Sequence, residues 1–311
     1  MVVGIKQGKA SKRVTASPFV KWAGGKRKLA PLLIESFPEE FDPLRHRFFE
    51  PFIGGGALMF ALGDKDKDFY IPGENLFIND LNPELTNVYE VIRDNVSGLI
   101  KALDALSKRI NEKTFYEIRA TVPRGKIARA ARFIYLNKTC FNGLWRVNSH
   151  GVFNVPYGKS KNPSLYDEAN LRACSKRLKG AIITNLGFDQ AVAKAKKGDL
   201  VYFDPPYIPL TPSASFSAYA KEGFNQQEHE LLAQTIKKLN EKGVYVLLSN
   251  SDTPLTRKIF RNVLTLRKVL MARSISSSGS TRKPVYEVLG MNYAHLRGSA
   301  MGNLDLISRP N

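Results

Sequence analysis

Short apolar runs alternate with amphipathic segments along most of the chain, a pattern that predicts strands alternating with helices. The apolar runs predict buried strands at residues 48–50, 76–79, 181–185, 200–203 and 244–249. Apolar residues at helical spacing predict helices that begin near residue 57 and span residues 83–95, 98–112, 126–138, 189–196 and 226–242. Thr253 is placed to cap one more helix, with Pro254 in its first turn. This alternation predicts an α/β fold with an open, mainly parallel sheet.

Some segments depart from the alternation. Residues 122–178 are rich in basic residues, asparagine and aromatics, and the glycines and asparagines at 142–158 predict a loop or hairpin. The serine- and glycine-rich interruption at 276–280 predicts a late hairpin over 271–293. We therefore predict a division into a flexible basic arm at 1–17, a main α/β domain at 18–112 and 179–297, an inserted, mostly helical domain carrying a β-hairpin at 113–178, and a tail at 298–311.

Charge narrows the class of partner. The 311 residues include 47 Lys and Arg against 28 Asp and Glu, a formal net charge of +19. Such a surface attracts a polyanion, most often nucleic acid, although a ribosome-associated or simply cationic protein has the same composition. Cys140 and Cys174 form no CxxC pair, which favours a reducing cytoplasm. The scattered histidines predict no metal site, and without an apolar run of ~18 residues no membrane partner is expected.

Asp204-Pro205-Pro206-Tyr207 follows a predicted buried strand. Ligands of open α/β sheets bind beyond the carboxyl ends of strands, so these residues are placed to contact one. The Asp204 carboxylate and the Pro205 carbonyl are acceptors for an exocyclic amine, and Tyr207 offers a face on which a planar base stacks. A simple turn after a strand is the structural alternative.

A glycine-rich turn follows the first predicted strand and includes Phe52, Gly54 and Gly56. Glycine lets a ligand approach the backbone closely, but the spacing is neither the dinucleotide motif nor a P-loop. Asp80 ends the next strand, where a carboxylate can bind a ribose diol. Together they favour a nucleoside cofactor without pyrophosphate, for which S-adenosylmethionine is the obvious candidate. Trp22 and Lys26 could contribute, although Trp22 could equally be a core residue.

With these motifs in this order, the chain resembles the Dam family of DNA adenine methyltransferases, of the D12 class, and within it the GATC-specific branch. The matching strings are KWAGGK at 21–26, EPFIGGGAL at 50–58, NDLNPEL at 79–85, YLNKTCFNGLWRVNSHGVFNVPYG at 135–158 and DPPY at 204–207. The resemblance covers roughly residues 19–293. It implies a Rossmann-like, S-adenosylmethionine-dependent methyltransferase sheet, with the 113–178 insertion as the target-recognition domain.

The resemblance also implies roles for individual residues. The catalytic set is Asp204, Pro205, Pro206 and Tyr207, and the cofactor set is Trp22, Lys26, Phe52, Gly54, Gly56, Asp80 and Asp204. The implied DNA-binding set is Lys21, Phe141, Asn142, Leu144, Arg146, Asn148, Asn154 and Pro156. Phe141 would intercalate beside a flipped base, where the family often has tyrosine. Arg146 would read guanine, Leu144 and Pro156 the thymine, and Lys21 the first guanine.

The sequence therefore predicts a site-specific enzyme that methylates adenine N6 in GATC of duplex DNA. We expect direct transfer to a flipped adenine, without a metal, by a cytoplasmic monomer that is nucleoid-associated or phage-encoded. Alternatives are an enzyme of the same class with another target, a cytosine-N4, RNA or protein-amide methyltransferase, or a catalytically silent DNA-binding homologue. The string DPPY disfavours several of these, because cytosine-N4 enzymes usually carry Ser, and RNA or amide enzymes more often Asn, at position 204.

Overall fold

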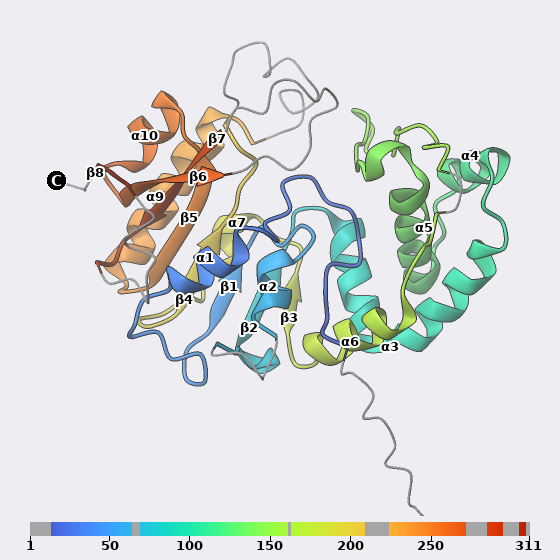
Figure 1. Cartoon of the computed structure of the whole chain (residues 1–311), viewed down its shortest axis with the longest axis horizontal. Coiled ribbons are helices and arrows are strands. Elements are labelled where there is room, and N and C mark those ends of the chain that lie inside the picture. The colour runs from blue at the N-terminus through green and yellow to red at the C-terminus, as the bar shows by residue number, and fades with distance from the viewer. Residues whose placement is uncertain are drawn as a thin grey trace, which may run out of the picture.

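The computed structural model describes residues 14–63, 69–160, 163–208, 224–271, 285–294 and 305–308. A mixed sheet runs through the molecule in the order β3-β2-β1-β4-β5-β7-β6-β8 (Figure 1). Its strands are β1 (Phe48–Glu50), β2 (Leu76–Asn79), β3 (Ile182–Thr184), β4 (Leu200–Phe203), β5 (Tyr245–Ser251), β6 (Thr265–Met271), β7 (Val285–Met291) and β8 (Asp305–Ser308).

Strands β1 to β5 are parallel to their neighbours, whereas β7, β6 and β8 join antiparallel to the β5 side. The chain leaves β1 toward β2 and β3 on one side, and continues from β4 to β5 on the other. The order therefore reverses between β1 and β4, and in an open α/β sheet this reversal is where ligands bind. The predicted α/β class is confirmed, but the sheet is mixed, because it is parallel from β3 to β5 and antiparallel from β5 to β8.

Both faces of the sheet are covered by apolar layers. Alternate residues of one strand enter different clusters: Phe48 packs into one and Phe49 into the other. Leu200 and Val201 of β4 divide in the same way. A strand side chain alternates between faces, so a strand covered on both faces appears in sequence as a continuous apolar run. This explains why the short apolar runs were recognisable as strands.

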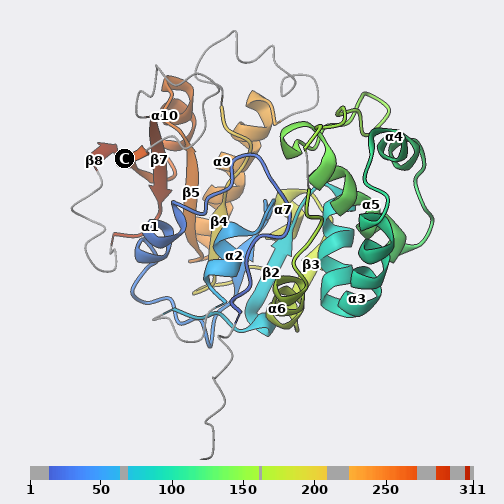
Figure 2. The ribbon, with the colours of Figure 1, turned by 45° about the vertical axis from the view of Figure 1, so that its right-hand side comes forward.

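The apolar layer that contains Phe48 and Leu200 receives side chains from α1 (Ala30–Glu35), α2 (Ala57–Ala61), α3 (Pro83–Ser107), α5 (Lys126–Thr139) and α6 (Glu168–Leu178). The layer on the other face, which contains Phe49 and Val201, receives side chains from α9 (Gln226–Glu241) and α10 (Pro254–Phe260). The other described helices are α4 (Glu112–Ala120), α7 (Phe188–Ala191), η1 (Gly73–Asn75) and η2 (Phe141–Gly143). Figures 1 and 2 show α3, α4 and α5 gathered on one side of the molecule, with α9 and α10 on the other.

Several predicted elements differ from the structure. The helices predicted at 83–95 and 98–112 are one helix, α3, with a kink at Asn95, whose side chain accepts a hydrogen bond from the backbone of Gly98. Helix α4 was not predicted from the sequence. Asn111 caps it by accepting a hydrogen bond from the Thr114 N–H. The helix predicted at 189–196 is only the short α7. At Asn95 and Asn111 a polar side chain bends or starts a helix, which apolar spacing alone does not specify.

The ends of the chain also differ from expectation. Ser17, the last residue of the predicted flexible arm, is anchored because its N–H and hydroxyl both bond to Asn170 Oδ1. Residues 305–308, placed in a tail, form β8 and pair with β6. The late hairpin is present as the antiparallel pair β6 and β7, but its interruption at 276–280 lies outside the described residues, as do residues 1–13 of the arm.

Candidate active site

Acidic and glycine-rich segments meet at the carboxyl edge of three neighbouring strands. Asp80 follows β2, the turn at 51–56 follows β1, and Asp204 follows β4. The pairing of β2 with β1 and of β1 with β4 is parallel, so these segments share one edge of the sheet. They lie where the strand order reverses, as expected for a ligand site.

The glycine turn depends on conformations that other residues disfavour. Gly54 and Gly56 have φ of 47° and 70°, in the left-handed region. A Cβ on Gly54 would approach the indole of Trp22 to 2.7 Å, so the ring needs the missing side chain. Trp22 also packs beside Phe133, with ring centroids 6.2 Å apart. The alternatives considered for Trp22 are therefore compatible, because one face packs on the core while the ring borders the turn.

Asp80 is fixed by the backbone around it. Its Oδ2 accepts from the Gly54 N–H at 3.1 Å and its Oδ1 from the Asn82 N–H at 2.9 Å. Burial raises the pKa of Asp80, and these two backbone hydrogen bonds oppose the rise. Each carboxylate oxygen has a second lone pair, so Asp80 can also accept from two ligand hydroxyls. This pair of acceptor oxygens fits the ribose hydroxyls of a nucleoside cofactor.

Asp204 is held from two sides. Ser249 Oγ donates to Asp204 Oδ1 at 2.7 Å, and Lys26 Nζ lies 3.2 Å from the same oxygen. Tyr202 extends the chain of polar contacts, with its hydroxyl 2.9 Å from Ser249 Oγ. Burial raises the pKa of Asp204, while the charge of Lys26 and the Ser249 hydrogen bond oppose the rise. Among the described residues both of these contacts are made to Oδ1, so the carboxylate is oriented through that oxygen.

The other three residues of the DPPY string differ in how far they are buried. Pro205 is buried, Pro206 is exposed and Tyr207 is partly buried. Lys26 Nζ lies 4.2 Å from the Tyr207 ring centroid, and its ammonium also donates to the Gly24 carbonyl at 3.0 Å. Lys26 therefore joins the segment 21–26 to both ends of the DPPY string.

Phe52 lies at the rim of the second apolar cluster. Its ring centroid is 5.6 Å from that of Phe188 and 5.4 Å from that of Phe224. The Phe52 side chain is only partly buried, so this aromatic group continues from the core toward the carboxyl edge of the sheet. A planar apolar surface at this edge suits contact with a purine ring.

Residues 141–158 follow α5 and contain most of the residues predicted to bind DNA; we call them the recognition segment. Several of their side chains are exposed. Phe141 is 51% exposed and Leu144 41% exposed, although both are large and apolar. Isolated bridges join Cys140 to Tyr157 and Val147 to Phe153, and Trp145 packs between Phe133 and Phe153. The Trp145 ring contacts and the two bridges therefore hold the segment in place, while Phe141 and Leu144 remain exposed.

The other residues predicted to bind DNA lie in the same segment. Arg146 is exposed, and its Nε donates to Asn154 Oδ1 at 2.7 Å. Asn148 accepts from the backbone N–H groups of His150 and Val152, which shapes the tip of the segment. Pro156 is exposed, and its carbonyl accepts from the Phe141 N–H at 2.9 Å. Asn142 has a positive φ of 55°.

One buried amide links this segment to the cofactor-side segment 21–26. Asn137 of α5 accepts from the Lys21 N–H and donates to the Lys21 carbonyl, both at 2.8 Å. It also donates to the Gly143 carbonyl at 3.0 Å. Since Lys26 contacts Asp204, the two predicted residue sets are connected through residues 21–26.

Three residues that hold the site together were not predicted from the sequence: Ser249, Glu287 and Asn137. Ser249 could have been found, because it lies near the end of a predicted parallel strand next to β4. Glu287 lies on the antiparallel β7, and no local pattern shows which residue an antiparallel strand places beside Tyr207. The buried position of Asn137 depends on contacts between segments far apart in sequence.

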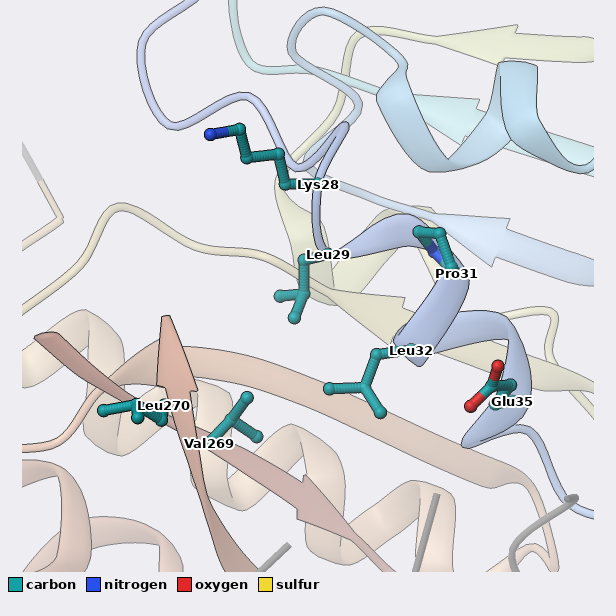
Figure 3. Close-up of a pocket in the computed structure, with 7 residues that line it drawn as sticks. All are labelled: Lys28, Leu29, Pro31, Leu32, Glu35, Val269 and Leu270. Atoms are coloured by element: carbon teal, nitrogen blue, oxygen red, sulfur yellow. The ribbon is translucent and has the colours of Figure 1, made fainter. Parts of the chain in front are cut away.

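A separate hollow lies between α1 and β6, with a volume of about 420 Å³. Leu29 and Leu32 point toward Val269 and Leu270 across it (Figure 3). Lys28, Pro31 and Glu35 complete its lining, and none of the residues predicted to bind cofactor or DNA takes part. Within the described ranges, no group of His, Cys, Asp and Glu is arranged to hold a metal, and no helix has the length and apolarity to cross a membrane.

The sheet order and the acidic strand ends are consistent with the fold of S-adenosylmethionine-dependent methyltransferases. Residues 22–273 match the family described as D12 class N6 adenine-specific DNA methyltransferase, and the chain belongs to this family. It is therefore an adenine-specific DNA methyltransferase, with S-adenosylmethionine as methyl donor and DNA as substrate.

Characterised relatives match nearly the whole chain. The Type II methyltransferase M1.LlaDCHI of Lactococcus lactis subsp. cremoris is 37% identical, over 91% of this chain and 98% of its own. The Type II methyltransferase M.MjaIII of Methanocaldococcus jannaschii is 38% identical, over 89% and 99%. The DNA adenine methylase of Escherichia coli (strain K12) is 32% identical, over 88% and 94%.

Proposed function

We propose that this enzyme methylates N6 of the adenine in GATC of duplex DNA, after that adenine has turned out of the helix. The observation that carries the proposal is the position of Asp204-Pro205 at the carboxyl end of β4, one strand away from the turn that borders Trp22. It places amine acceptors beside a site that fits a nucleoside cofactor. An exposed recognition segment on the same chain supplies the means of selecting a sequence.

Cofactor binding is assigned to the carboxyl edge. Asp80 accepts the ribose hydroxyls, Trp22 and Phe52 border the purine, and Gly54 and Gly56 allow close approach to the backbone. When bound, S-adenosylmethionine supplies an electrophilic methyl group. Asp204, paired with Lys26, would then border both the cofactor pocket and the adenine pocket.

The target amine is held by acceptors that belong to this chain. Asp204 Oδ2 and the Pro205 carbonyl accept the two N–H bonds of N6, which directs the nitrogen lone pair toward the methyl group. Tyr207 stacks on the adenine ring, and Pro206 limits the backbone freedom of the string. Positive charge that develops on N6 is stabilised by the same two oxygens.

Recognition of the DNA target sequence is assigned to the segment that follows α5. Arg146 is suited to bind guanine O6 and N7, a contact worth roughly 1–3 kcal/mol of discrimination. Leu144 and Pro156 offer apolar contact to a thymine methyl, and Phe141 fills the gap that the flipped base leaves. Lys21 contacts the first guanine, while Asn142, Asn148 and Asn154 shape and extend the contact surface.

We infer the same division of the chain as the sequence predicts, with catalysis at 18–112 and 179–297 and target recognition at 113–178. The enzyme acts as a monomer. The names of the Lactococcus and Methanocaldococcus relatives support a role as the modification enzyme of a restriction system. A relative named DNA adenine methylase supports a role outside restriction equally well.

Methyl transfer from labelled S-adenosylmethionine to short duplexes tests the proposal. One duplex carries GATC, and the controls change each position in turn. Label confined to the GATC adenine is the expected result, and Asp204→Ala should abolish it while some DNA binding remains. Label on another adenine site would keep the enzyme class and discard the assigned target sequence. Full activity of the Asp204→Ala enzyme would discard the assigned role of the carboxylate.

A further inference from the structure

The Tyr207 hydroxyl is bonded to a strand far away in sequence. Tyr207 Oη donates to Glu287 Oε2 at 2.8 Å. Glu287 lies on β7, opposite Ser251 of β5 and Val269 of β6. The backbone of β7 is therefore paired on both sides at this residue, so the carboxylate projects from a rigid element. A catalytic tyrosine in a loop after β4 thus has one end fixed to the sheet.

The Tyr207 ring is restrained at a second point. Lys26 Nζ lies over the ring, 4.2 Å from its centroid, and the same ammonium is 3.2 Å from Asp204 Oδ1. Burial raises the pKa of Tyr207 well above its usual value, and the charges of Asp204 and Glu287 raise it further. The hydroxyl therefore stays protonated and acts as the donor to Glu287. Within the described residues, Glu287 thus holds the hydroxyl and Lys26 lies over one face of the ring.

We propose that Glu287 is a positioning residue for methyl transfer: it fixes the Tyr207 ring against which the target adenine stacks. The inference rests on the proposed stacking role of Tyr207 and extends it to a residue outside the DPPY string. A ring free to rotate about its side-chain bonds would let the adenine shift, and N6 would then leave the line between its two acceptors and the methyl group. Small displacements of a reacting atom lower the rate of transfer more than they weaken binding.

The first experiment separates turnover from binding. It measures kcat, and KM for S-adenosylmethionine and for the duplex that the wild-type enzyme methylates, in Glu287→Ala and Glu287→Gln. Loss of one charge-assisted hydrogen bond predicts a fall in kcat of about tenfold for Glu287→Ala, with KM for S-adenosylmethionine unchanged. Glu287→Gln keeps an acceptor oxygen and should stay within about threefold of wild type. Equal losses in the two variants would overturn the proposal, because they would assign the effect to charge and not to the Tyr207 contact.

A matched control lies on the same strand. Tyr286 is the neighbour of Glu287, is 42% exposed, and carries Lys268 over its ring at 3.6 Å. Tyr286→Ala perturbs β7 without removing the contact to Tyr207, and should leave kcat within about twofold of wild type. A loss in Tyr286→Ala as large as that in Glu287→Ala would overturn the proposal, since it would attribute both effects to the strand.

A double-mutant cycle then tests whether Glu287 acts through Tyr207. Tyr207→Phe keeps the ring and removes the hydroxyl, so it deletes the hydrogen bond to Glu287 from the other side, together with the contact of the hydroxyl with Ser249. We expect Tyr207→Phe, Glu287→Ala and the double variant each to lose about tenfold in kcat, because the second change has nothing left to remove. A hundredfold loss in the double variant would mean independent effects and would overturn the proposal. If Glu287→Ala does not fold, an unchanged kcat in Tyr207→Phe alone would overturn it.

Failure of this proposal is distinguishable from failure of the proposed function. Inactive Asp204→Ala and Tyr207→Ala enzymes, beside a fully active Glu287→Ala enzyme, would keep the stacking role and reject only the positioning role. Full activity in Tyr207→Ala would reject the stacking role itself, and the inference about Glu287 with it.

Discussion

Asn142 occupies a backbone conformation that few side chains adopt. Its φ of 55° lies between Phe141 and Gly143, where the chain turns out of α5. Asn142→Gly should preserve this turn, whereas Asn142→Ala should lower the free energy of unfolding by about 1 kcal/mol relative to the Gly variant. Both changes remove the side chain assigned to DNA, so both should weaken binding of the target duplex. Urea unfolding and duplex titration measure the two effects separately. Wild-type affinity in Asn142→Gly would show that the residue serves the turn alone.

Glu50 is a fully buried carboxyl group beside the glycine turn. Within the part of the chain that the structure describes, its Oε2 has no hydrogen-bond partner. Burial and the charge of Asp204 raise the pKa of Glu50 well above its ordinary value of 4.5, more than Arg177 and a Met59 backbone hydrogen bond lower it. The folded protein therefore holds this proton at pH values where the unfolded chain has released it.

This difference predicts a pH-dependent effect of Glu50→Gln. Between pH 4.5 and the raised pKa, ionisation of the unfolded chain lowers the free energy of unfolding of the wild type as pH rises. The Gln side chain does not titrate, so the variant should gain stability relative to wild type by up to about 1.4 kcal/mol per pH unit across that window. Urea unfolding from pH 5 to 8 checks this, with Glu241→Gln on the exposed end of α9 as control. A difference that is constant with pH would contradict the expectation.

At the scale of elements, Asn137 holds segment 21–26 against the start of the recognition segment. Its amide satisfies three backbone groups, two of Lys21 and one of Gly143. Asn137→Ala leaves them without these partners and should cost about 2–3 kcal/mol in unfolding free energy. Since the same segment carries Trp22 and Lys26, affinity for S-adenosylmethionine should fall too.

Urea unfolding and equilibrium binding of S-adenosylmethionine measure this prediction. Gln226→Ala is a suitable control, because it removes an exposed amide that donates to Glu230, one turn along α9. A variant of Asn137 as stable as the control, with wild-type cofactor affinity, would show that the three backbone groups find other partners at no cost.

The elements show where sequence patterns stop being sufficient. The kink of α3 was predicted as a gap between two helices, because a polar break at Asn95 interrupts the apolar spacing. The pattern could not show that the helix continues through the break, since α3 is also held by packing against α5 and α6. Propensity sets where a helix weakens, and tertiary contacts decide whether it ends.

For the whole molecule, the sheet was predictable on one side and not on the other. Apolar runs followed by Asp80, the glycine turn and Asp204 are local signals, and parallel strands bring their carboxyl ends together without further information. The β5-β7-β6-β8 side depends on antiparallel register between distant residues, which no local pattern specifies. That is why Asp204 and Tyr207 could be predicted from sequence, and Ser249 at the end of a parallel strand could have been, whereas Glu287 on antiparallel β7 could not.

The net charge of +19 predicts how the molecule as a whole binds DNA. Affinity for any duplex should fall steeply as salt rises, because binding releases counterions from the phosphates. Arg146→Ala and Lys237→Ala each remove one positive charge, but only Arg146 lies in the recognition segment. We expect Arg146→Ala to lower the ratio of target to non-target affinity by about tenfold to a hundredfold. Lys237→Ala should leave that ratio unchanged. Titrations of both variants at several salt concentrations test the distinction, and an equal loss of discrimination in the two would mean that Arg146 contributes charge without reading the sequence.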